Sequence, residues 1–165
     1  MKLHLRPFTE NDLEALVNLA NNPKIAANLT DQFPYPYTRE HGVRFIEMVT
    51  QHEPTRIFAL EFEGDFCGAV GLHPQTDIMR KNAELGYWVA EPFWGKGIAT
   101  HAIRRMIDYG FQNFDIVRIF ARPYGPNIAS QKVLEKAGFK LEARLSKTIY
   151  KNEEFLDELI YAIRK

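Results

Sequence analysis

Two glycines flank a lysine at the point where a strand-like segment gives way to a helix-like one, in Trp94-Gly95-Lys96-Gly97. Glycine lets the backbone approach a ligand closely, and the first amide N–H groups of a helix have no partner within the helix. Such a helix start attracts phosphate through its N–H donors and its dipole, and Lys96 adds a positive charge. The pattern indicates a phosphate-binding loop, although a tight turn that caps a helix would produce the same three residues.

Two well-known phosphate motifs do not fit this segment. A P-loop requires a further glycine at a fixed distance before the Gly-Lys pair, and this chain has none there. A dinucleotide-binding fold expects an acidic residue at the end of the next strand. The next expected strand, 116–121, ends instead in Arg122-Pro123.

The elements that must position this loop follow from hydrophobic periodicity. Strands are expected over 2–6, 57–62, 66–72, 83–89, 116–121, 141–145 and 155–163. Helices are expected over 13–20, 39–49, 99–110 and 127–137. An antiparallel meander thus precedes a strand–helix–strand crossover, which predicts a mixed sheet.

Local signals mark where these elements begin and end. Thr9 and Asp12 resemble a capping pair before the first helix, Asn22-Pro23 should end that helix, and Gly138 should cap the helix over 127–137. Turns are expected at Gly64-Asp65 and Lys151-Asn152. The second helix is expected to bury one side, consisting of Val43, Ile46 and Val49.

Length and composition narrow the class of protein. The 165 residues suit one domain spanning 1–165, and 21 basic against 21 acidic residues disfavour a dedicated nucleic-acid binder. No apolar stretch reaches the roughly 18 residues of a membrane span, and the N-terminus lacks a signal-peptide pattern, so a cytoplasmic location is expected. The single cysteine, Cys67, excludes an internal disulfide and is expected to be a small buried residue.

The segment Trp94–Ala99 resembles the pyrophosphate loop of the GNAT acetyltransferases, Arg/Gln-x-x-Gly-x-Gly/Ala, with Trp94 at the first position. That variant is similar to the ribosomal-protein N-terminal acetyltransferase (RimJ/RimL-like) branch, as are the segments 84–89, 127–130 and 135–139. The resemblance implies an α/β (α+β) fold. Its mixed sheet would have about seven strands with helices on both faces, splayed between the fourth and fifth strands.

The same resemblance implies acetyl-CoA as cosubstrate and no metal. The pantetheine arm would pair with the strand backbone near Trp88 and Val89, and the pyrophosphate would lie on the amides of 95–100. The implied cofactor-binding residues are Trp88, Val89, Trp94, Gly95, Lys96, Gly97, Ile98, Ala99, Thr100 and Asn127. For Asn127, capping of the following helix is an alternative role, and the two can coexist.

An amine is mostly protonated at neutral pH, so transfer to it requires a base. Glu84, on the strand that would border the cleft, is the first candidate, with a salt bridge as an equal alternative. His73 is the second candidate. Where the family often has a tyrosine acid for the departing thiolate, this chain has Leu134, and Ser130 is the candidate that remains.

The resemblance thus implies an N-acetyltransferase acting on a primary amine, with a protein N-terminal α-amine as a candidate acceptor. It would be a monomer or homodimer without membrane or nucleic-acid partners. A small-molecule amine acetyltransferase and a catalytically inert acyl-CoA-binding module remain alternatives. Phe33, Tyr35 and Tyr37 would line the acceptor pocket or pack in the core.

Overall fold

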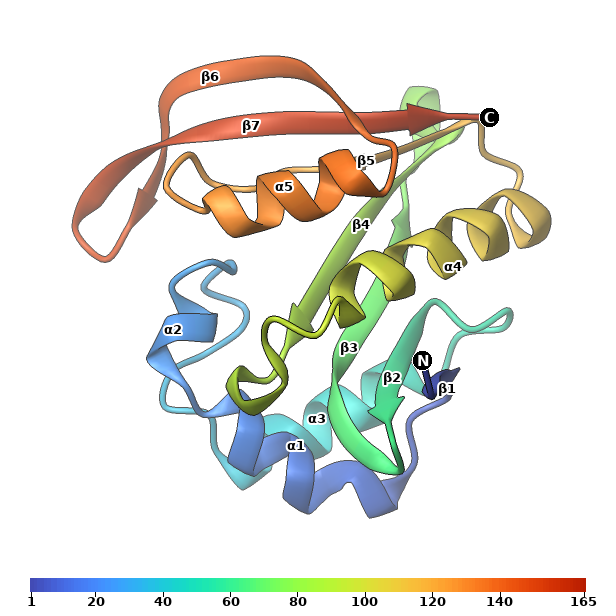
Figure 1. The fold of residues 1–165 in the computed structure, drawn as a ribbon, viewed down its shortest axis with the longest axis vertical. Coiled ribbons are helices and arrows are strands. Elements are labelled where there is room, and N and C mark those ends of the chain that lie inside the picture. The colour runs from blue at the N-terminus through green and yellow to red at the C-terminus, as the bar shows by residue number, and fades with distance from the viewer. The chain divides into compact units, whose positions relative to one another are not determined.

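The computed structural model describes residues 1–165 and contains one hydrogen-bonded sheet in the order β1-β2-β3-β4-β5-β7-β6 (Figure 1). The strands are Leu3–Arg6 (β1), Ile57–Phe62 (β2), Asp65–Pro74 (β3), Asn82–Val89 (β4), Arg118–Ala121 (β5), Lys140–Lys151 (β6) and Glu154–Arg164 (β7). The β4–β5 pair is parallel, whereas β1–β2, β2–β3, β5–β7 and β6–β7 are antiparallel. The predicted mixed sheet of about seven strands is therefore confirmed.

The helices also follow the expected order, with one addition. They are Leu13–Ala20 (α1), Pro23–Ala26 (α2), Arg39–Val49 (α3), Ile98–Asn113 (α4) and Ile128–Lys136 (α5), and three short 3₁₀ turns are Glu10–Asp12 (η1), Asp77–Met79 (η2) and Glu91–Phe93 (η3). The chain divides into two compact units, Met1–Gly71 with Tyr87–Ala102 and Leu72–Gly86 with Ile103–Lys165.

In the first unit, the 3₁₀ turn η1, which runs directly into α1, is capped by a network around a buried carboxylate. Asp12 is 4 % exposed and accepts hydrogen bonds from the Thr9 amide at 2.9 Å and from Arg6 Nη1 and Nη2 at 2.9 and 2.7 Å. The Thr9 hydroxyl in turn accepts from the Asn11 amide. These contacts satisfy amide groups that have no partner inside a helix, and they confirm the predicted capping pair.

Helices α1 and α3 pack together in this unit (Figure 1), and Gly42 of α3 lies against side chains of α1. A Cβ at Gly42 would lie 2.8 Å from side-chain carbons of both Leu13 and Val17, so α1 occupies the space above it. Gly42, Ile46 and Val49 form the buried side of α3, whereas Val43 is 38 % exposed. The prediction that Val43 is buried is wrong because the glycine brings the helices together one position earlier.

The hairpin β2–β3 turns at Glu63-Gly64, with φ of 54° and 92°, one residue earlier than expected. The Leu60↔Gly68 and Glu61↔Phe66 pairs leave one extra residue, Cys67, in β3 as a bulge. Helix α1 ends at Ala20, just before the predicted stop at Asn22-Pro23. The Asn22 side chain accepts from the Lys24 amide and starts α2, which the sequence did not indicate.

The second unit is built around β5, β7 and β6, with α5 beside β7 (Figure 1). Tyr161 of β7 donates its hydroxyl hydrogen to Glu135 of α5 at 2.9 Å. Gly138, at φ 102°, follows the end of α5 as predicted. The β6–β7 turn lies at Asn152-Glu153, one residue later than expected.

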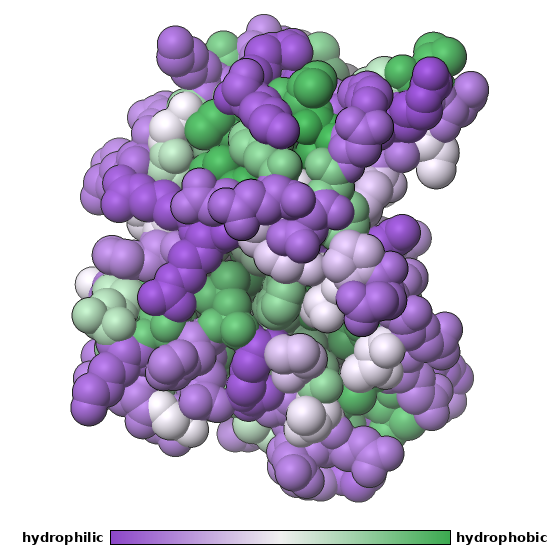
Figure 2. Space-filling view, turned by 90° about the vertical axis from the view of Figure 1, so that its right-hand side faces the viewer, coloured by the Kyte–Doolittle hydropathy of each residue, from purple (hydrophilic) through white to green (hydrophobic).

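Hydrophilic residues cover most of the face shown in Figure 2, with hydrophobic side chains visible in smaller patches. None of the helices combines the length and the apolar character that crossing a membrane requires.

Candidate functional site

The pairing of β4 with β5 is short. Its register covers Asn82↔Arg118, Ala83↔Ile119 and Glu84↔Phe120, whereas β4 continues to Val89. The predicted splay between the fourth and fifth strands of the chain corresponds to this early end of the parallel ladder. Glu84 is thus the last β4 residue in register with β5.

In the first unit, β4 leads through η3 into the glycine loop and α4. Gly95 and Gly97 have φ of 76° and 75°, a left-handed conformation that suits glycine. Nothing lies within 4 Å of a Cβ built on Gly95, and at Gly97 the nearest atoms are 3.8 Å away. The loop backbone is therefore open to a ligand, as a phosphate site requires.

The start of α4 follows this loop directly. Ile98 and Thr100 are buried, at 2 % and 9 % exposure, whereas Lys96 is exposed. His101 lies one turn into the helix, with Nδ1 2.9 Å from the Gly97 carbonyl oxygen. The side chains of 98 and 100 anchor the helix, so that the amides of its first turn can serve an anion.

The end of β4 presents different main-chain groups on its two edges. The Trp88 carbonyl faces β3, because a Cβ on Gly68 would collide with its oxygen. The Trp88 ring is 8 % exposed and contacts the rings of Phe33 and Phe66 at centroid distances of 5.7 and 6.0 Å. Trp88 is therefore a core residue whose carbonyl faces β3, and a pantetheine contact at this residue stays a prediction.

The Val89 carbonyl, on the other edge, accepts a hydrogen bond from Trp94 Nε1 at 2.6 Å. Trp94 itself is 47 % exposed. The Val89 carbonyl oxygen keeps a second lone pair, and Trp94 does not engage the Val89 amide, so a pantetheine contact at Val89 stays a prediction.

In the second unit, Glu84 forms a two-pronged ion pair with Arg122. Arg122 Nε and Nη2 donate to the two carboxylate oxygens of Glu84 at 3.1 and 3.0 Å. Burial lowers the pKa of Arg122, but the hydrogen bonds and charge of Glu84 outweigh it and raise the pKa above its ordinary value. The salt-bridge alternative for Glu84 is confirmed. Its role as a base stays a prediction.

Asn127 and Ser130 lie at the start of α5 in the same unit. The Asn127 side-chain oxygen accepts from the Ser130 amide at 3.3 Å, so the capping role is confirmed. Leu134, at the position where the family often has tyrosine, is fully buried. His73, the alternative base, is exposed on β3, with its ring 3.6 Å from a Cβ built on Gly86.

The remaining candidates behave as core residues. Cys67 is fully buried, and burial raises the pKa of its thiol to about 12, which excludes a thiolate nucleophile near neutral pH. Tyr37 is 4 % exposed and packs against Phe33, whereas Tyr35 is 54 % exposed. Core packing is therefore confirmed for Tyr37 and Phe33. The structure contains no cluster of three or more potential metal ligands.

The structure brings the predicted site residues together in two groups. Val89 and Trp94 are bonded in one unit, and Asn127 and Ser130 in the other. Sequence reasoning missed Arg122 as a site residue. Its place after the expected strand was visible, but its pairing with Glu84 depends on the register of β4 and β5.

Comparisons with known proteins agree with this geometry. Residues 2–140 match the family model described as "Acetyltransferase (GNAT) domain". A Bacillus subtilis protein named "Putative ribosomal N-acetyltransferase YdaF" is 36 % identical over 106 residues, which cover 64 % of this chain and 57 % of that protein.

Two solved structures share the fold over nearly the whole chain. The microcin C7 self-immunity acetyltransferase MccE, in complex with acetyl-CoA and AMP, has a TM-score of 0.84 and 28 % identity, covering 99 % of this chain and 92 % of that one. Spermidine N-acetyltransferase from Vibrio cholerae, in complex with CoA and spermine, has a TM-score of 0.83 and 25 % identity, covering 99 % and 95 %.

Proposed function

Because this chain belongs to the GNAT family of N-acetyltransferases, which take their acetyl group from acetyl-CoA, we propose that its acceptor is the α-amine of a protein or peptide. The relative named as a putative ribosomal N-acetyltransferase supports this acceptor class, with 36 % identity over 64 % of this chain, whereas the spermidine enzyme has 25 % identity over 99 %. The observation that carries the proposal is the ion pair between Glu84 and Arg122.

The residues present fit acetyl-CoA. Gly95 and Gly97 leave the loop backbone open, and the amides of 95–100 would hold the diphosphate, with Lys96 adding charge. When bound, acetyl-CoA supplies an activated acetyl thioester. Asn127 would hold the pantetheine arm in addition to capping α5.

The charge balance at Glu84 favours a peptide acceptor over a polyamine. A polyamine carries several positive charges, whereas both oxygens of Glu84 already accept from Arg122, and the charge of Glu158 acts on the same guanidinium. A peptide N-terminus carries one ammonium group followed by carbonyl oxygens. The guanidinium of Arg122 has five N–H donors on three nitrogens. Nε and Nη2 donate to Glu84, so Nη1 can donate to a peptide carbonyl.

Glu84 would then remove a proton from the bound ammonium, directly or through a water molecule. The neutral nitrogen attacks the thioester carbonyl, the carbon–sulfur bond breaks with its electron pair on sulfur, and the nitrogen gives up its second proton to the departing thiolate or to water, which yields the amide. A coenzyme A thiol has a pKa near that of ordinary thiols, about 8.5, so the thiolate can depart without a strong acid. Ser130 therefore has at most a supporting role.

The test compares acceptors under identical conditions. Purified enzyme is incubated with acetyl-CoA and peptides that begin with Ser, Ala or Thr, with the same peptides blocked at the α-amine, and with spermidine and other small amines. CoA release and the mass of the product are measured. We expect turnover of the free peptides alone. Turnover confined to spermidine or another small amine would replace the proposed acceptor class.

Arg122→Gln adds a second readout. If Arg122 binds a peptide carbonyl, the variant should raise KM for the peptide by about tenfold, since a hydrogen bond to a charged group is lost, with KM for acetyl-CoA unchanged. An unchanged peptide KM would remove Arg122 from the acceptor site.

A further inference from the structure

In the segment between β4 and α4, the side chains of Glu91 and Phe93 anchor η3 to other residues of the first unit. Glu91 accepts from Asn22 Nδ2 at 2.7 Å and from Lys24 Nζ at 2.6 Å. Phe93 contacts the ring of Phe62 edge-on, with centroids 6.3 Å apart. These contacts hold η3, but none of them involves Trp94, the residue before Gly95.

That residue, Trp94, has its own anchor in the Val89 carbonyl. The direction of this carbonyl follows from the neighbouring peptide group. The Ala90 amide donates to the Cys67 carbonyl of β3 at 2.8 Å, and in a trans peptide the N–H and C=O groups point in opposite directions. The Val89 carbonyl therefore points away from β3, where Trp94 Nε1 meets it at 2.6 Å.

The hydrogen bond, rather than burial, holds the indole in place. Trp94 is 47 % exposed, so much of its ring area stays in water. Its backbone is extended, at φ −65° and ψ 152°, and leads directly into Gly95 in the left-handed conformation. The hydrogen bond thus joins the two ends of the segment from Val89 to Trp94, with η3 between them, and sets the direction in which the glycine loop leaves Trp94.

We propose that residue 94 positions the phosphate-binding loop by donating an N–H hydrogen bond to the last carbonyl of β4. This inference rests on acetyl-CoA as the cosubstrate and is independent of the acceptor. An indole nitrogen donates and never accepts, which suits a carbonyl partner. Arginine and glutamine, the residues of the family motif at this position, also carry an N–H at the ε position, the same number of bonds from Cβ as Trp Nε1.

Three substitutions separate the donor from the ring. Trp94→Phe keeps an aromatic ring without the donor, Trp94→Gln restores a donor without the ring, and Trp94→Met matches glutamine in length without a donor. The dissociation constant of acetyl-CoA is measured for each by titration calorimetry at fixed salt. Circular dichroism and the melting temperature without ligand check the fold.

We expect Trp94→Phe and Trp94→Met to bind acetyl-CoA about three- to tenfold more weakly, the loss expected for one neutral hydrogen bond. The dissociation constant of acetyl-CoA for Trp94→Gln should stay within about twofold of that for the parent protein, although phenylalanine resembles tryptophan more closely in shape than glutamine does. With any acceptor that turns over, KM for acetyl-CoA should follow the same order while kcat stays constant. Equal affinity of the Phe and Gln variants, whether strong or weak, would overturn the proposal.

A second measurement uses the unmodified protein. The chain has two tryptophans, Trp88 and Trp94, so its ¹⁵N–¹H spectrum contains two indole signals, and Trp94→Phe assigns them. The Trp94 indole N–H should exchange with solvent more slowly than a free indole despite its exposure, both with and without acetyl-CoA. Exchange at the free-indole rate, or its onset when acetyl-CoA binds, would show that the bond does not hold the loop in the working state.

Discussion

Arg122 donates to both carboxylate oxygens of Glu84, from Nε at 3.1 Å and from Nη2 at 3.0 Å, across the last register position of the parallel β4–β5 ladder. The pair joins a residue within one strand to the residue that directly follows the other. It holds a carboxylate of 22 % side-chain exposure in a fixed orientation at the point where the two strands cease to pair.

If Glu84 is the base, Glu84→Gln should lower kcat by roughly 10²–10⁴-fold, with little change in the affinity for acetyl-CoA. The measurement is kcat at saturating substrates between pH 6 and 9. Arg122→Gln is the control, because it breaks the same ion pair and keeps the carboxylate. Similar losses in both variants would assign the effect to the broken pair, and full activity of Glu84→Gln would leave His73 or a chain of water molecules as the base.

Ser130→Ala should reduce kcat by no more than about tenfold, which is about 1.4 kcal/mol of barrier, because the thiolate leaves without strong acid assistance. The Ser130 amide keeps its bond to Asn127, so α5 should retain its cap. Steady-state kinetics with the melting temperature as control test this. A thousandfold loss at normal cofactor affinity would make the hydroxyl an essential acid.

Gly97→Ala should weaken acetyl-CoA binding, and Gly64→Ala is its matched control. Both glycines have positive φ, 75° and 92°, and neither has an atom closer than 3.8 Å to an added Cβ, so each substitution should cost a similar 1–2 kcal/mol of backbone strain. Thermal unfolding with and without acetyl-CoA separates strain from binding. The ligand-induced rise in Tm should shrink for Gly97→Ala and persist for Gly64→Ala. An equal rise in both variants would remove the loop from the binding site.

Asp12 should make stability depend on acidic pH. Burial raises the pKa of Asp12, but the hydrogen bonds from Arg6 and the Thr9 amide and the charge of Arg6 together lower it by more. The folded-state pKa therefore lies below the unfolded value of about 3.9. Its stabilising contribution is therefore complete above that value and is lost as the pH falls through the folded pKa.

Asp12→Asn should accordingly lower the free energy of unfolding by about 1–3 kcal/mol at pH 7, and the difference from the parent should narrow below about pH 4. Urea unfolding at several pH values measures this. Glu10→Gln, an exposed change in the same turn η1, should have little effect at any pH. A difference that stays constant down to pH 3 would contradict the assigned ionisation.

The fold could be predicted from the sequence wherever periodicity and local signals agreed, as at the Thr9–Asp12 cap, the glycine after α5 and the order of the strands. What failed depends on contacts between elements. Val43 was misplaced because Gly42 is buried by Leu13 and Val17 of another helix, which no pattern within α3 reveals. Both hairpin turns were one residue off, because the residues with positive φ include Glu63 and Glu153.

In the candidate site, too, local features could be predicted and contacts between distant segments could not. The glycine loop could be predicted because its requirement is local, an open backbone at a helix start. The partner of Glu84 could not, since it depends on the register of two parallel strands that are far apart in sequence. The bond from Trp94 to Val89 also escaped prediction, because it depends on the path of the chain through η3.

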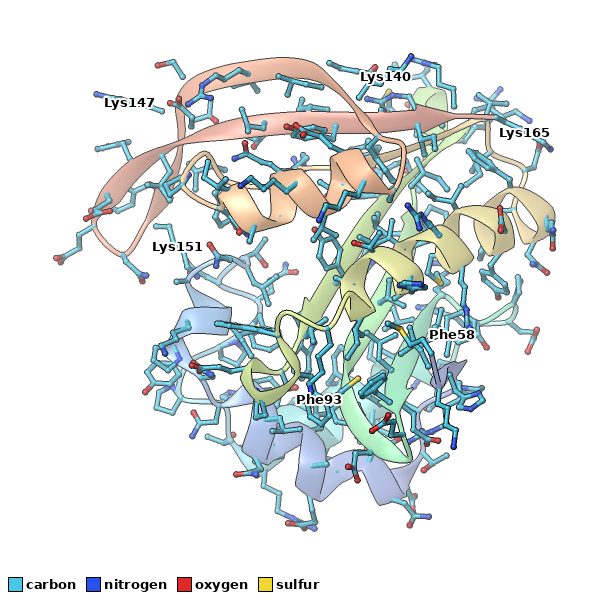
Figure 3. All side chains as sticks on the ribbon, viewed as in Figure 1. Phe58, Phe93, Lys140, Lys147, Lys151 and Lys165 are labelled. Atoms are coloured by element: carbon cyan, nitrogen blue, oxygen red, sulfur yellow. The ribbon has the colours of Figure 1, made fainter.

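One of the two edge strands of the sheet, β6, has a consequence for how the protein behaves in concentrated solution. It pairs with β7 on one side and carries exposed apolar side chains, including Leu141 and Tyr150, on a long edge of the kind that joins edge to edge into aggregates. Lys140 and Lys147 stand along that strand (Figure 3). Repulsion between these ammonium groups should keep two molecules from stacking by their edges, so colloidal stability should fall as added salt screens the charge.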